Sequence, residues 1–523
     1  MATVLVEGFD KYGPPGLVYP SLEPLLNAGG WSVRRGVYNP STPPPYVVPS
    51  LNGVSGYAIQ LPAPGVYDLR GLDRTLNANY SRLIGGFRFS VSQITAGYRV
   101  ASGWALFDGS TAQCAIVVQP VSNRFLFVQG DGTAVTPVVL QTSTIGVADN
   151  TEHFLEFDIT IGTIGGWTVW LDGMQILNGT GNTQLSGNPY CNVFSMFTSN
   201  AYSPGNVTNL LTMDDLYLFD DTTSYNNSVL LSNPIVQTDV AIGDHTVQFT
   251  NQGYVFGNYP PHSSSSTSIG ANTLYLVAVS PNASGAAAAV EVLPTTTSAS
   301  VNIKGVMYAD NGGVPGSLLS DGVQVTGLTA NVPTQLPLAS PPAFTAGTSY
   351  WIGFYADTTI SFQRYDGTIL GKTAANTYTS GAPLTAPAMT PNVASLGIFV
   401  TCNTLGSNWQ SEGLNPPIGD QSSVTGTTAG VSDLYIFPAL PTSVAQVYTV
   451  GVTCNARMLS PGTRMMNYNV SSSGTLSAGS APSQGLTTTY AWYASYFDTD
   501  PHTTTTWSPA AVAAAYAGMS IVV

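Results

Sequence analysis

Short runs of alternating apolar and polar residues recur along almost the whole chain, and turn-forming residues separate them. Clear examples are GGFRFSVSQI at 85–94, HFLEFDITI at 153–161 and WTVWLDGMQIL at 167–177. Successive side chains of a β-strand point to opposite faces, so this spacing predicts strands with one buried face. Helical periodicity is nearly absent. The sequence therefore predicts an all-β protein made of several antiparallel β-sandwich domains.

Two local signals make this prediction more specific. The Asp172-Gly173 pair lies between two apolar runs and predicts a tight hairpin turn. Near the end of the chain, Ser508 and Pro509 precede an Ala-rich stretch, and Gly518 follows it. This order predicts one short C-terminal helix that ends at Gly518, followed by a final strand.

Composition narrows the class of protein. The 523 residues suggest about three domains at ~150 residues each. Charged residues make up 8% of the chain, against about 25% in typical soluble proteins. The 27 Tyr, 19 Phe and 8 Trp argue against disorder, so Thr, Ser, Asn and Gly must cover the surface. Such surfaces suit extended β-proteins that pack against copies of themselves. The net charge of −14 and the lack of a Lys/Arg cluster exclude nucleic-acid binding.

No motif predicts catalysis, a cofactor or a metal site. GxSxG and HExxH are absent, and the four cysteines are scattered without metal-ligand spacing, which favours free thiols. The best metal candidates are Asp214 and Asp215, expected to enter a strand, and Asp220 and Asp221, expected to leave it. Roughly 15 Å separates the ends of such a strand, so the two pairs cannot share one ion. Many other acids lie in Asp-Gly or Asp-Asn turns, and nothing specific supports a glycosidase.

The chain ends give no sign of membrane targeting. Charged residues interrupt the first apolar run, so no signal peptide is visible, and the apolar C-terminal stretch is too short to span a bilayer. We therefore expect synthesis and folding in a cytoplasm, without membrane insertion.

Two regions resemble proteins of tailed bacteriophages. VEGFDKYG at 6–13, together with HFLEFDITI, WTVWLDGMQIL and DDLYLFDD at 214–221, resembles the concanavalin A-like or laminin-G-like jelly rolls of phage virion proteins. The C-terminal block resembles the end of the same protein group, with matches at Asp433–Tyr435, Asn455–Arg457, Asp500, Pro501, Trp507 and Ser508. His502 and the TTTT run at 503–506 depart from the pattern.

The resemblance also implies a domain division. In that group, the segment around 244–249 leads directly to the region around 408, whereas about 155 residues intervene here. We expect a jelly roll at 1–225, a C-terminal β-domain formed by 226–250 plus 408–523, and an inserted β-sandwich at 251–407. The insert resembles small adhesin-like or carbohydrate-binding-like sandwiches.

The resemblance implies a non-enzymatic structural protein on a tailed-phage virion, assembled in the host cytoplasm. A tail fibre, spike or tail-tip component is favoured, with a capsid decoration protein or head fibre as the alternative and a glycan depolymerase as a third possibility. The expected partners are other virion proteins, copies of itself with a trimer favoured, and a host-surface glycan.

The richest aromatic cluster lies in the expected insert. Tyr350, Trp351, Phe354 and Tyr355 fall on one strand, and Trp351 and Tyr355 share a face opposite Tyr350 and Phe354. One face is expected to be core, and the other could offer aromatic surface to a sugar or a protein. The alternative is that both faces are covered.

Overall fold

The computed structural model confirms the all-β prediction. It describes residues 3–12, 22–35, 45–51, 56–61, 69–92, 101–119, 122–131, 137–199, 210–231, 234–239, 241–246, 250–251, 254–258, 266–281, 284–330, 332, 334–365, 371–391, 395–402, 424–426, 428–458, 463–478 and 484–522. Backbone packing divides the chain into two compact units, one of residues 1–239 with 439–523 and one of residues 240–438. The finer three-domain division stays a prediction.

Helices are few and short. In the described ranges, the α-helices are α1 (Leu22–Ala28) and α3 (Pro509–Ala513), and single 3-10 turns occur at η1 (Asp10–Tyr12) and η2 (Tyr378–Ser380). The predicted short C-terminal helix is confirmed as α3, whereas α1 was not predicted, because it has only seven residues and too little periodic pattern to be recognised. None of these described helices is long and apolar enough to cross a membrane.

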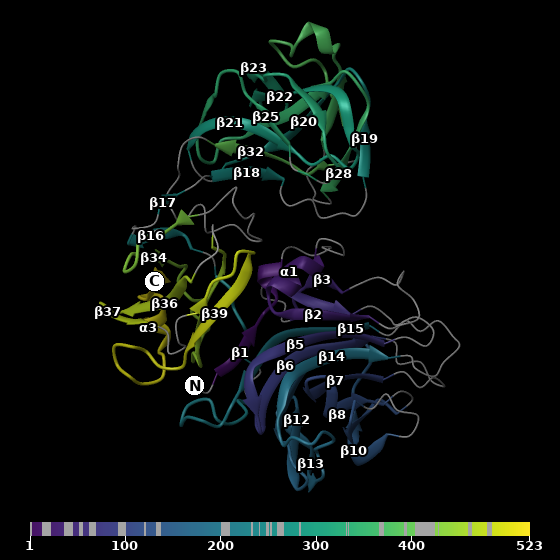
Figure 1. The fold of residues 1–523 in the computed structure, drawn as a ribbon, viewed down its shortest axis with the longest axis vertical. Coiled ribbons are helices and arrows are strands. Elements are labelled where there is room, and N and C mark those ends of the chain that lie inside the picture. The colour runs from purple at the N-terminus through teal and green to yellow at the C-terminus, as the bar shows by residue number, and fades with distance from the viewer. Residues whose placement is uncertain are drawn as a thin grey trace. The chain divides into compact units, whose positions relative to one another are not determined.

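The N-terminal part of the first unit is a jelly roll of two facing antiparallel sheets (Figure 1). The first sheet has the order β13-β12-β11-β6-β15-β4-β3, with β1 paired to β15. Its strands are β1 (Thr3–Glu7), β3 (Tyr46–Pro49), β4 (Tyr57–Leu61), β6 (Arg82–Ser92), β11 (Glu152–Thr160), β12 (Gly165–Leu171), β13 (Met174–Gly181) and β15 (Leu210–Phe219).

The second sheet has the order β10-β9-β8-β7-β14-β5-β2. Its strands are β2 (Trp31–Arg35), β5 (Leu69–Tyr80), β7 (Ala101–Asp108), β8 (Thr111–Val118), β9 (Arg124–Gln129), β10 (Val138–Gly146) and β14 (Cys191–Ser199).

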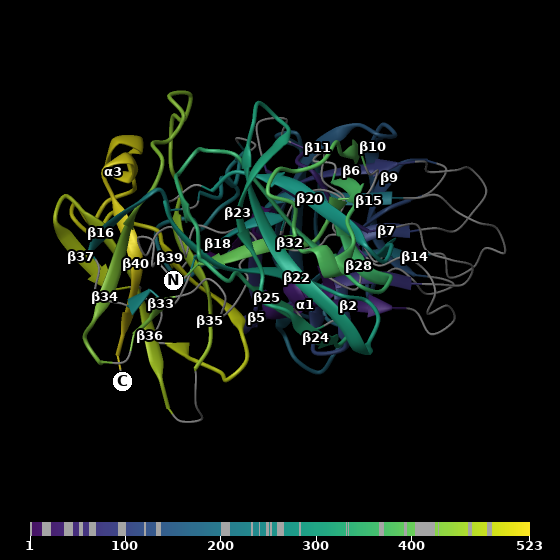
Figure 2. The same ribbon diagram turned by 90° about the horizontal axis from the view of Figure 1, so that it is seen from above.

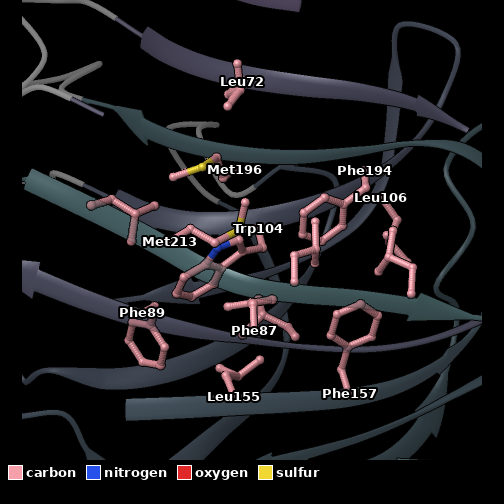
Figure 3. Close-up of a cluster of buried hydrophobic side chains, with 14 of the residues drawn as sticks. Leu72, Phe87, Phe89, Trp104, Leu106, Leu155, Phe157, Phe194, Met196 and Met213 are labelled. Carbon is pink, nitrogen blue, oxygen red and sulfur yellow. The ribbon is translucent and has the colours of Figure 1, made fainter. Parts of the chain in front are cut away.

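Alternate residues of both sheets meet in one aromatic-rich core (Figure 3). Phe87 of β6 and Trp104 of β7 face each other with ring centroids 4.5 Å apart, and Phe157 stacks on Phe194 across the same gap. Full burial of each such side chain contributes roughly 1.5–3 kcal/mol. The alternation that predicted the strands therefore also assigns the residues that hold the two sheets together.

The predicted hairpin is confirmed. Strands β12 and β13 pair antiparallel, with Leu171 opposite Met174. Asp172 and Gly173 have φ values of 50° and 78°, the left-handed conformation that a tight two-residue hairpin requires at both positions.

The segment that follows β15 is anchored to the outer face of the first sheet. Glu156 accepts backbone hydrogen bonds from Leu230 and Leu231, at 2.8 and 2.9 Å to Oε1, and it also accepts one from the hydroxyl of Tyr217. Further along, the backbone N–H of Val236 donates to Asp215. These contacts hold parts of residues 220–239 against strands β11 and β15.

The C-terminal part of the first unit is a set of short antiparallel pairings (Figure 2). Strands β35 (Val450–Ala456) and β39 (Ala491–Phe497) pair with each other, while β36 (Met465–Ser472) pairs with β37 (Thr475–Ala478), β38 (Gln484–Gly485) and β40 (Tyr516–Ile521). The predicted N-cap is confirmed, since Ser508 Oγ accepts from the N–H of Ala511. The predicted stop at Gly518 was wrong, because the helix ends at Ala513 and Gly518 lies inside β40.

The second unit is a β-sandwich with its own core. Its larger sheets have the orders β23-β22-β27-β20-β29-β30, with β24 on β22, and β18-β32-β21-β25, with β26 on β21. The strands are β16 (Gly243–Thr246), β17 (Thr250–Asn251), β18 (Tyr254–Asn258), β19 (Ser266–Ile269), β20 (Thr273–Val279), β21 (Gly285–Val292), β22 (Ser298–Asp310), β23 (Pro315–Asp321), β24 (Val325–Leu328), β25 (Thr334–Pro337), β26 (Ala343–Phe344), β27 (Tyr350–Ala356), β28 (Ile360–Tyr365), β29 (Lys372–Ala375), β30 (Thr390–Pro391), β31 (Ser395–Leu396), β32 (Ile398–Cys402), β33 (Val424–Thr425) and β34 (Ser432–Ile436).

Candidate functional site

The aromatic cluster expected to contact a partner is buried on both faces of β27. Tyr350 and Phe354 belong to the sandwich core, and Trp351 and Tyr355 belong to a second cluster on the opposite face. Partly buried apolar residues of segment 378–389 pack against that second cluster. The four residues are at most 8% exposed, so they present no aromatic surface.

Hydrogen bonds explain why polar aromatic groups tolerate this burial. Trp351 Nε1 donates to Asp310 at 2.7 Å, and the Tyr355 hydroxyl donates to both carboxylate oxygens of Asp321 at 2.9 and 3.0 Å. The cluster is therefore a satisfied structural element of the second unit.

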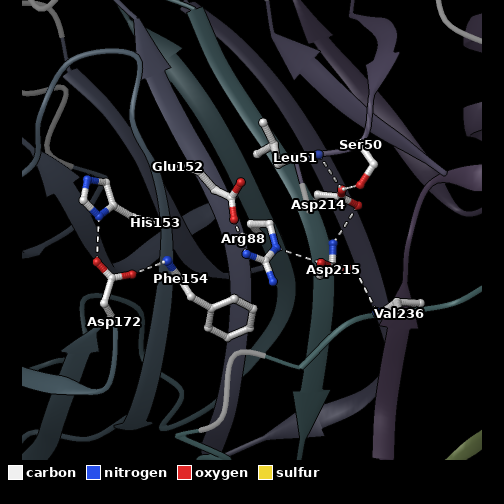
Figure 4. A network of polar contacts seen from close by, with 10 residues as sticks. All are labelled: Ser50, Leu51, Arg88, Glu152, His153, Phe154, Asp172, Asp214, Asp215 and Val236. Atoms are coloured by element: carbon white, nitrogen blue, oxygen red, sulfur yellow. Dashed lines mark hydrogen bonds and ion pairs between the residues drawn. The ribbon is translucent and has the colours of Figure 1, made fainter. Parts of the chain in front are cut away.

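The acidic residues of β15 belong to a network around Arg88 (Figure 4). The guanidinium of Arg88 donates to Asp215 at 2.9 Å and pairs with Glu152. Asp214 accepts from the hydroxyl of Ser50 at 2.6 Å and from the N–H of Leu51 at 3.1 Å. Burial and the neighbouring charge of Asp215 raise the pKa of Asp214 to about 7.

Asp214 and Asp215 lie inside β15 and not at its start as expected. A β-bulge falls here, and Asp215 has a φ of 50°. Asp220 accepts from Thr222, and Asp221 lies 3.6 Å from Arg82, so the two acidic pairs serve different partners. No group of three or more His, Cys, Asp or Glu residues that could hold a metal ion occurs in the described part of the chain.

A different place in the first unit has the geometry of a binding site. A cavity of about 210 Å³ lies between strands β1, β5 and β39, lined by residues 3–5, 74–77 and 492–496. We call it the Arg74 pocket. Strand β39 is held beside β1 by the Tyr496 hydroxyl, which donates to the carbonyl of Val6 at 3.3 Å.

Arg74 occupies a position that the strand pattern assigns to the core. On β5 it lies between Leu72 and Leu76, whose side chains belong to the core. On the neighbouring strand β2 it is paired with Trp31, which also belongs to the core. Its guanidinium carbon is 5.9 Å from the Trp31 ring centroid. Gly30, with φ +79°, leaves the space that the guanidinium fills, because a Cβ there would collide with Nη1.

Glu7, whose pKa the charge of Arg74 helps to lower, is already bound to other partners. Its carboxylate is 2.8 Å from Lys11 Nζ and accepts from the Tyr12 hydroxyl, the Trp31 indole and the N–H of Phe9. Burial alone would raise the pKa of Glu7, but the charge and hydrogen bond of Lys11, followed by the charge of Arg74, hold it below its ordinary value. Lys11 therefore neutralises Glu7 at contact distance, and Arg74 acts on it only from further away.

Three lining residues carry buried polar atoms that have no hydrogen-bond partner among the described residues. These atoms are Nη1 of Arg74, Nε1 of Trp492 and Oγ of Ser495. Asn455, which lies across the strand pair from Trp492, has an unpaired Oδ1 as well. Buried polar atoms in native proteins are nearly always paired, and leaving one unpaired costs about 1–3 kcal/mol. Three of these atoms belong to residues that line the cavity, so a polar group bound there would meet donors and an acceptor that have no partner among the described residues.

Aromatic residues form the remaining wall. Strand β39 supplies three aromatic residues to the lining, Trp492, Tyr493 and Tyr496. The Trp492 ring is 5.6 Å from Lys11 Nζ, and Tyr496 is 8% exposed, with burial raising its pKa. The pocket thus combines aromatic rings, polar groups that have no hydrogen-bond partner among the described residues, and one cation. This mixture is typical of small-ligand sites.

Sequence reasoning missed this pocket. The signal was present, because an arginine at a core-facing position of an alternating strand has to find a partner or a ligand. The run AWYASYF at 491–497 has no comparable signal, since an aromatic-rich strand more often belongs to a core.

The chain matches no family model and no curated protein. Solved structures with partial similarity include an endo-β-1,4-glucuronan lyase from the fungus Trichoderma reesei, 15% identical, covering 36% of this chain and 91% of that chain with a TM-score of 0.28. A carbohydrate esterase from the Shiga toxin-encoding bacteriophage phi24B is 20% identical, covering 40% and 98%, with a TM-score of 0.27. Carbohydrate-binding module CBM66 from Bacillus subtilis is 9% identical, covering 37% and 96%, with a TM-score of 0.24.

These neighbours are β-sandwich and jelly-roll domains of carbohydrate-active proteins. They correct one expectation: the absence of enzymatic activity was inferred from missing motifs, yet the neighbours include polysaccharide lyases and a carbohydrate esterase.

Proposed function

We propose that the protein binds a carbohydrate and that the Arg74 pocket holds one of its sugar rings. The observation that carries this proposal is the pairing of an aromatic wall with buried polar atoms that have no partner among the described residues. A sugar ring has apolar C–H faces that pack on aromatic rings and hydroxyls that satisfy donors and acceptors around its edge.

The size of the cavity supports a small ligand group. Pockets for drug-sized molecules measure about 300–1,000 Å³. The Arg74 pocket, at about 210 Å³, suits one ring or a group of similar size. A longer glycan would enter with one residue and leave the rest outside.

Replacement of Trp492 by leucine tests the proposal. Loss of the indole should weaken glycan binding about tenfold or more, because aromatic side chains at the centre of a site carry much of its binding energy. Binding would be measured by calorimetry against a panel of acidic and neutral bacterial surface polysaccharides. Trp170, on strand β12 and absent from the pocket lining, supplies the matched control Trp170→Leu.

The outcomes separate the alternatives. Equal binding by the two variants would refute the pocket as the glycan site. Shortening of the polysaccharide during incubation with the wild-type protein would instead assign a glycan depolymerase.

We propose further that the protein is a surface component of a tailed-phage particle, in contact with other virion proteins and with copies of itself. Support comes from the resemblance at Asp433–Tyr435, Asn455–Arg457, Asp500, Pro501, Trp507 and Ser508 and from the weakly charged polar surface implied by composition. Copy number in purified particles tests it, because a tail component occurs in small multiples of three or six and a capsid decoration protein in numbers like those of the capsid protein. Absence from the particles would refute the assignment.

A further inference from the structure

The Arg74 pocket holds a positive charge for which the protein provides no adjacent counter-ion. Two other partly or fully buried cations of this unit each have an acid at contact distance. Arg88 has Asp215 and Glu152, and Lys11 has Glu7. For Arg74, no ion pair with an acid occurs within the part of the chain that the structure describes, and Nη1 is buried without a partner.

The acids around the pocket are engaged elsewhere. Glu7 is paired with Lys11. Asp498, next to β39, accepts from the N–H and the hydroxyl of Thr3 and, at 2.9 Å, from the side-chain amide of Asn226. Asp73 precedes Arg74 on β5 but points to the opposite face, where it binds Ser195 at 2.5 Å and Arg34 at 3.1 Å.

Two further titratable groups face this region. Burial raises the pKa of Asp10 to about 6, and Asp10 accepts from the N–H of Tyr57. Tyr12 donates to Glu7, and burial raises its pKa well above the ordinary value, so it stays neutral. Neither of these groups lines the pocket, and Arg74 is the one charged residue among the residues that do.

We propose that the bound sugar is acidic and that its carboxylate pairs with Arg74. This inference rests on the proposed carbohydrate binding and specifies the class of sugar. A carboxylate matches the planar fork of a guanidinium with two parallel hydrogen bonds, and it would supply the missing counter-charge. The hydroxyl of Ser495 and the amide of Asn77 line the same cavity and could bind neighbouring hydroxyls of the ring.

A single cation favours a carboxylate over a phosphate or sulfate group. Sites for phosphate groups usually gather several donors and more than one positive charge. Here Lys11 is held by Glu7, which leaves Arg74 as the cation available at the pocket.

The test compares acidic sugars with esters of the same skeleton and with a neutral sugar. The probes are oligogalacturonate and sialyllactose, their methyl esters, which retain the skeleton and mask the carboxylate, and neutral lactose. We expect the acids to bind about 10–100-fold more tightly than the esters, since a hydrogen bond to a charged group is worth about 1.5–3 kcal/mol. Arg74→Gln should remove this difference, and Arg34→Gln, on the opposite face of the same sheet, should preserve it.

Other outcomes overturn the inference in distinguishable ways. If acid and ester bind equally and Arg74→Gln has no effect, while Trp492→Leu abolishes binding, the protein binds carbohydrate but does not select acidic sugars. Tighter binding of a sulfated oligosaccharide than of the uronate would refute the carboxylate. If none of the acidic or neutral sugars binds, both this inference and the proposed function fail. Circular dichroism of each variant would confirm that it is folded.

Discussion

Replacing Arg74 by methionine should make the unliganded protein more stable while removing its affinity for acidic sugars. Methionine keeps an unbranched apolar stem beside Trp31 and removes the guanidinium, whose Nη1 is buried without a partner among the described residues. An unsatisfied buried donor costs about 1–3 kcal/mol, and more when it is charged. Residues that await a ligand commonly lower the stability of the empty protein in this way.

A smaller opposing effect limits the gain. The charge of Arg74 helps to hold the pKa of Glu7 low, although it contributes less than Lys11 does. Losing that attraction offsets part of the benefit. We therefore expect the free energy of unfolding of Arg74→Met to rise by about 1–2 kcal/mol.

Arg34 supplies the matched control. It lies on the adjacent strand of the same sheet and also has one buried nitrogen, Nε, without a partner within the described ranges, but its Nη2 donates to Ser195 at 2.7 Å and lies 3.1 Å from Asp73. Its side chain is 24% exposed, so the pair is partly screened by solvent. Arg34→Met should therefore destabilise the protein by about 0.5–1 kcal/mol.

Urea unfolding followed by tryptophan fluorescence measures both changes, because Trp31 and Trp492 lie close to Arg74. The midpoint should rise for Arg74→Met and fall for Arg34→Met, with unchanged slopes. If Arg74→Met lowers the midpoint as Arg34→Met does, the guanidinium already has the interactions it needs, and the argument for a charged ligand is wrong.

Two further predictions concern the jelly roll itself. Asp214 has a pKa raised to about 7, from 3.8, so its contribution to stability is complete below about pH 4 and is lost as pH rises toward 7. Asp214→Asn should therefore reduce the slope of unfolding free energy against pH, measured by denaturation between pH 4 and 8, by at most about 1.4 kcal/mol per pH unit. An unchanged slope would contradict the raised pKa of Asp214. The buried side chain of Gln113 accepts hydrogen bonds from the N–H groups of Leu185 and Ser186 at 2.7 and 2.9 Å. Gln113→Leu should therefore lower the free energy of unfolding by about 2–4 kcal/mol and make residues 184–190 sensitive to protease. Protease resistance equal to that of the wild type would show that the loop does not depend on Gln113.

The fold was largely predictable from the sequence because its strands obey local rules. The run at 153–161 alternates, and its inward residues Leu155, Phe157 and Ile159 enter the core as the pattern requires. The hairpin at Asp172-Gly173 was equally local, since two adjacent positive φ angles favour this pair of residues. Such features depend on neighbours in sequence and are readable without tertiary information.

Features that depend on distant contacts were not predictable. The helix α3 began at its predicted cap but ended early, because pairing of β40 with β36 draws Gly518 into a sheet. Strand β27 carried aromatics on both faces, and only the structure shows that segment 378–389 packs over the second face. The Arg74 pocket combines strands from both ends of the chain, so no local pattern could have brought its residues together.

The composition of that pocket has a consequence for how the protein is made. Tyr496 binds the carbonyl of Val6, a residue 490 positions earlier. At about 5–20 residues per second, a ribosome needs roughly 25–100 s to synthesise the chain between them. Strand β1 and the edge of β5 therefore emerge long before the strand that completes the pocket. During that interval, Arg74 lacks the wall that β39 supplies, and the pocket is complete only after β39 has been synthesised.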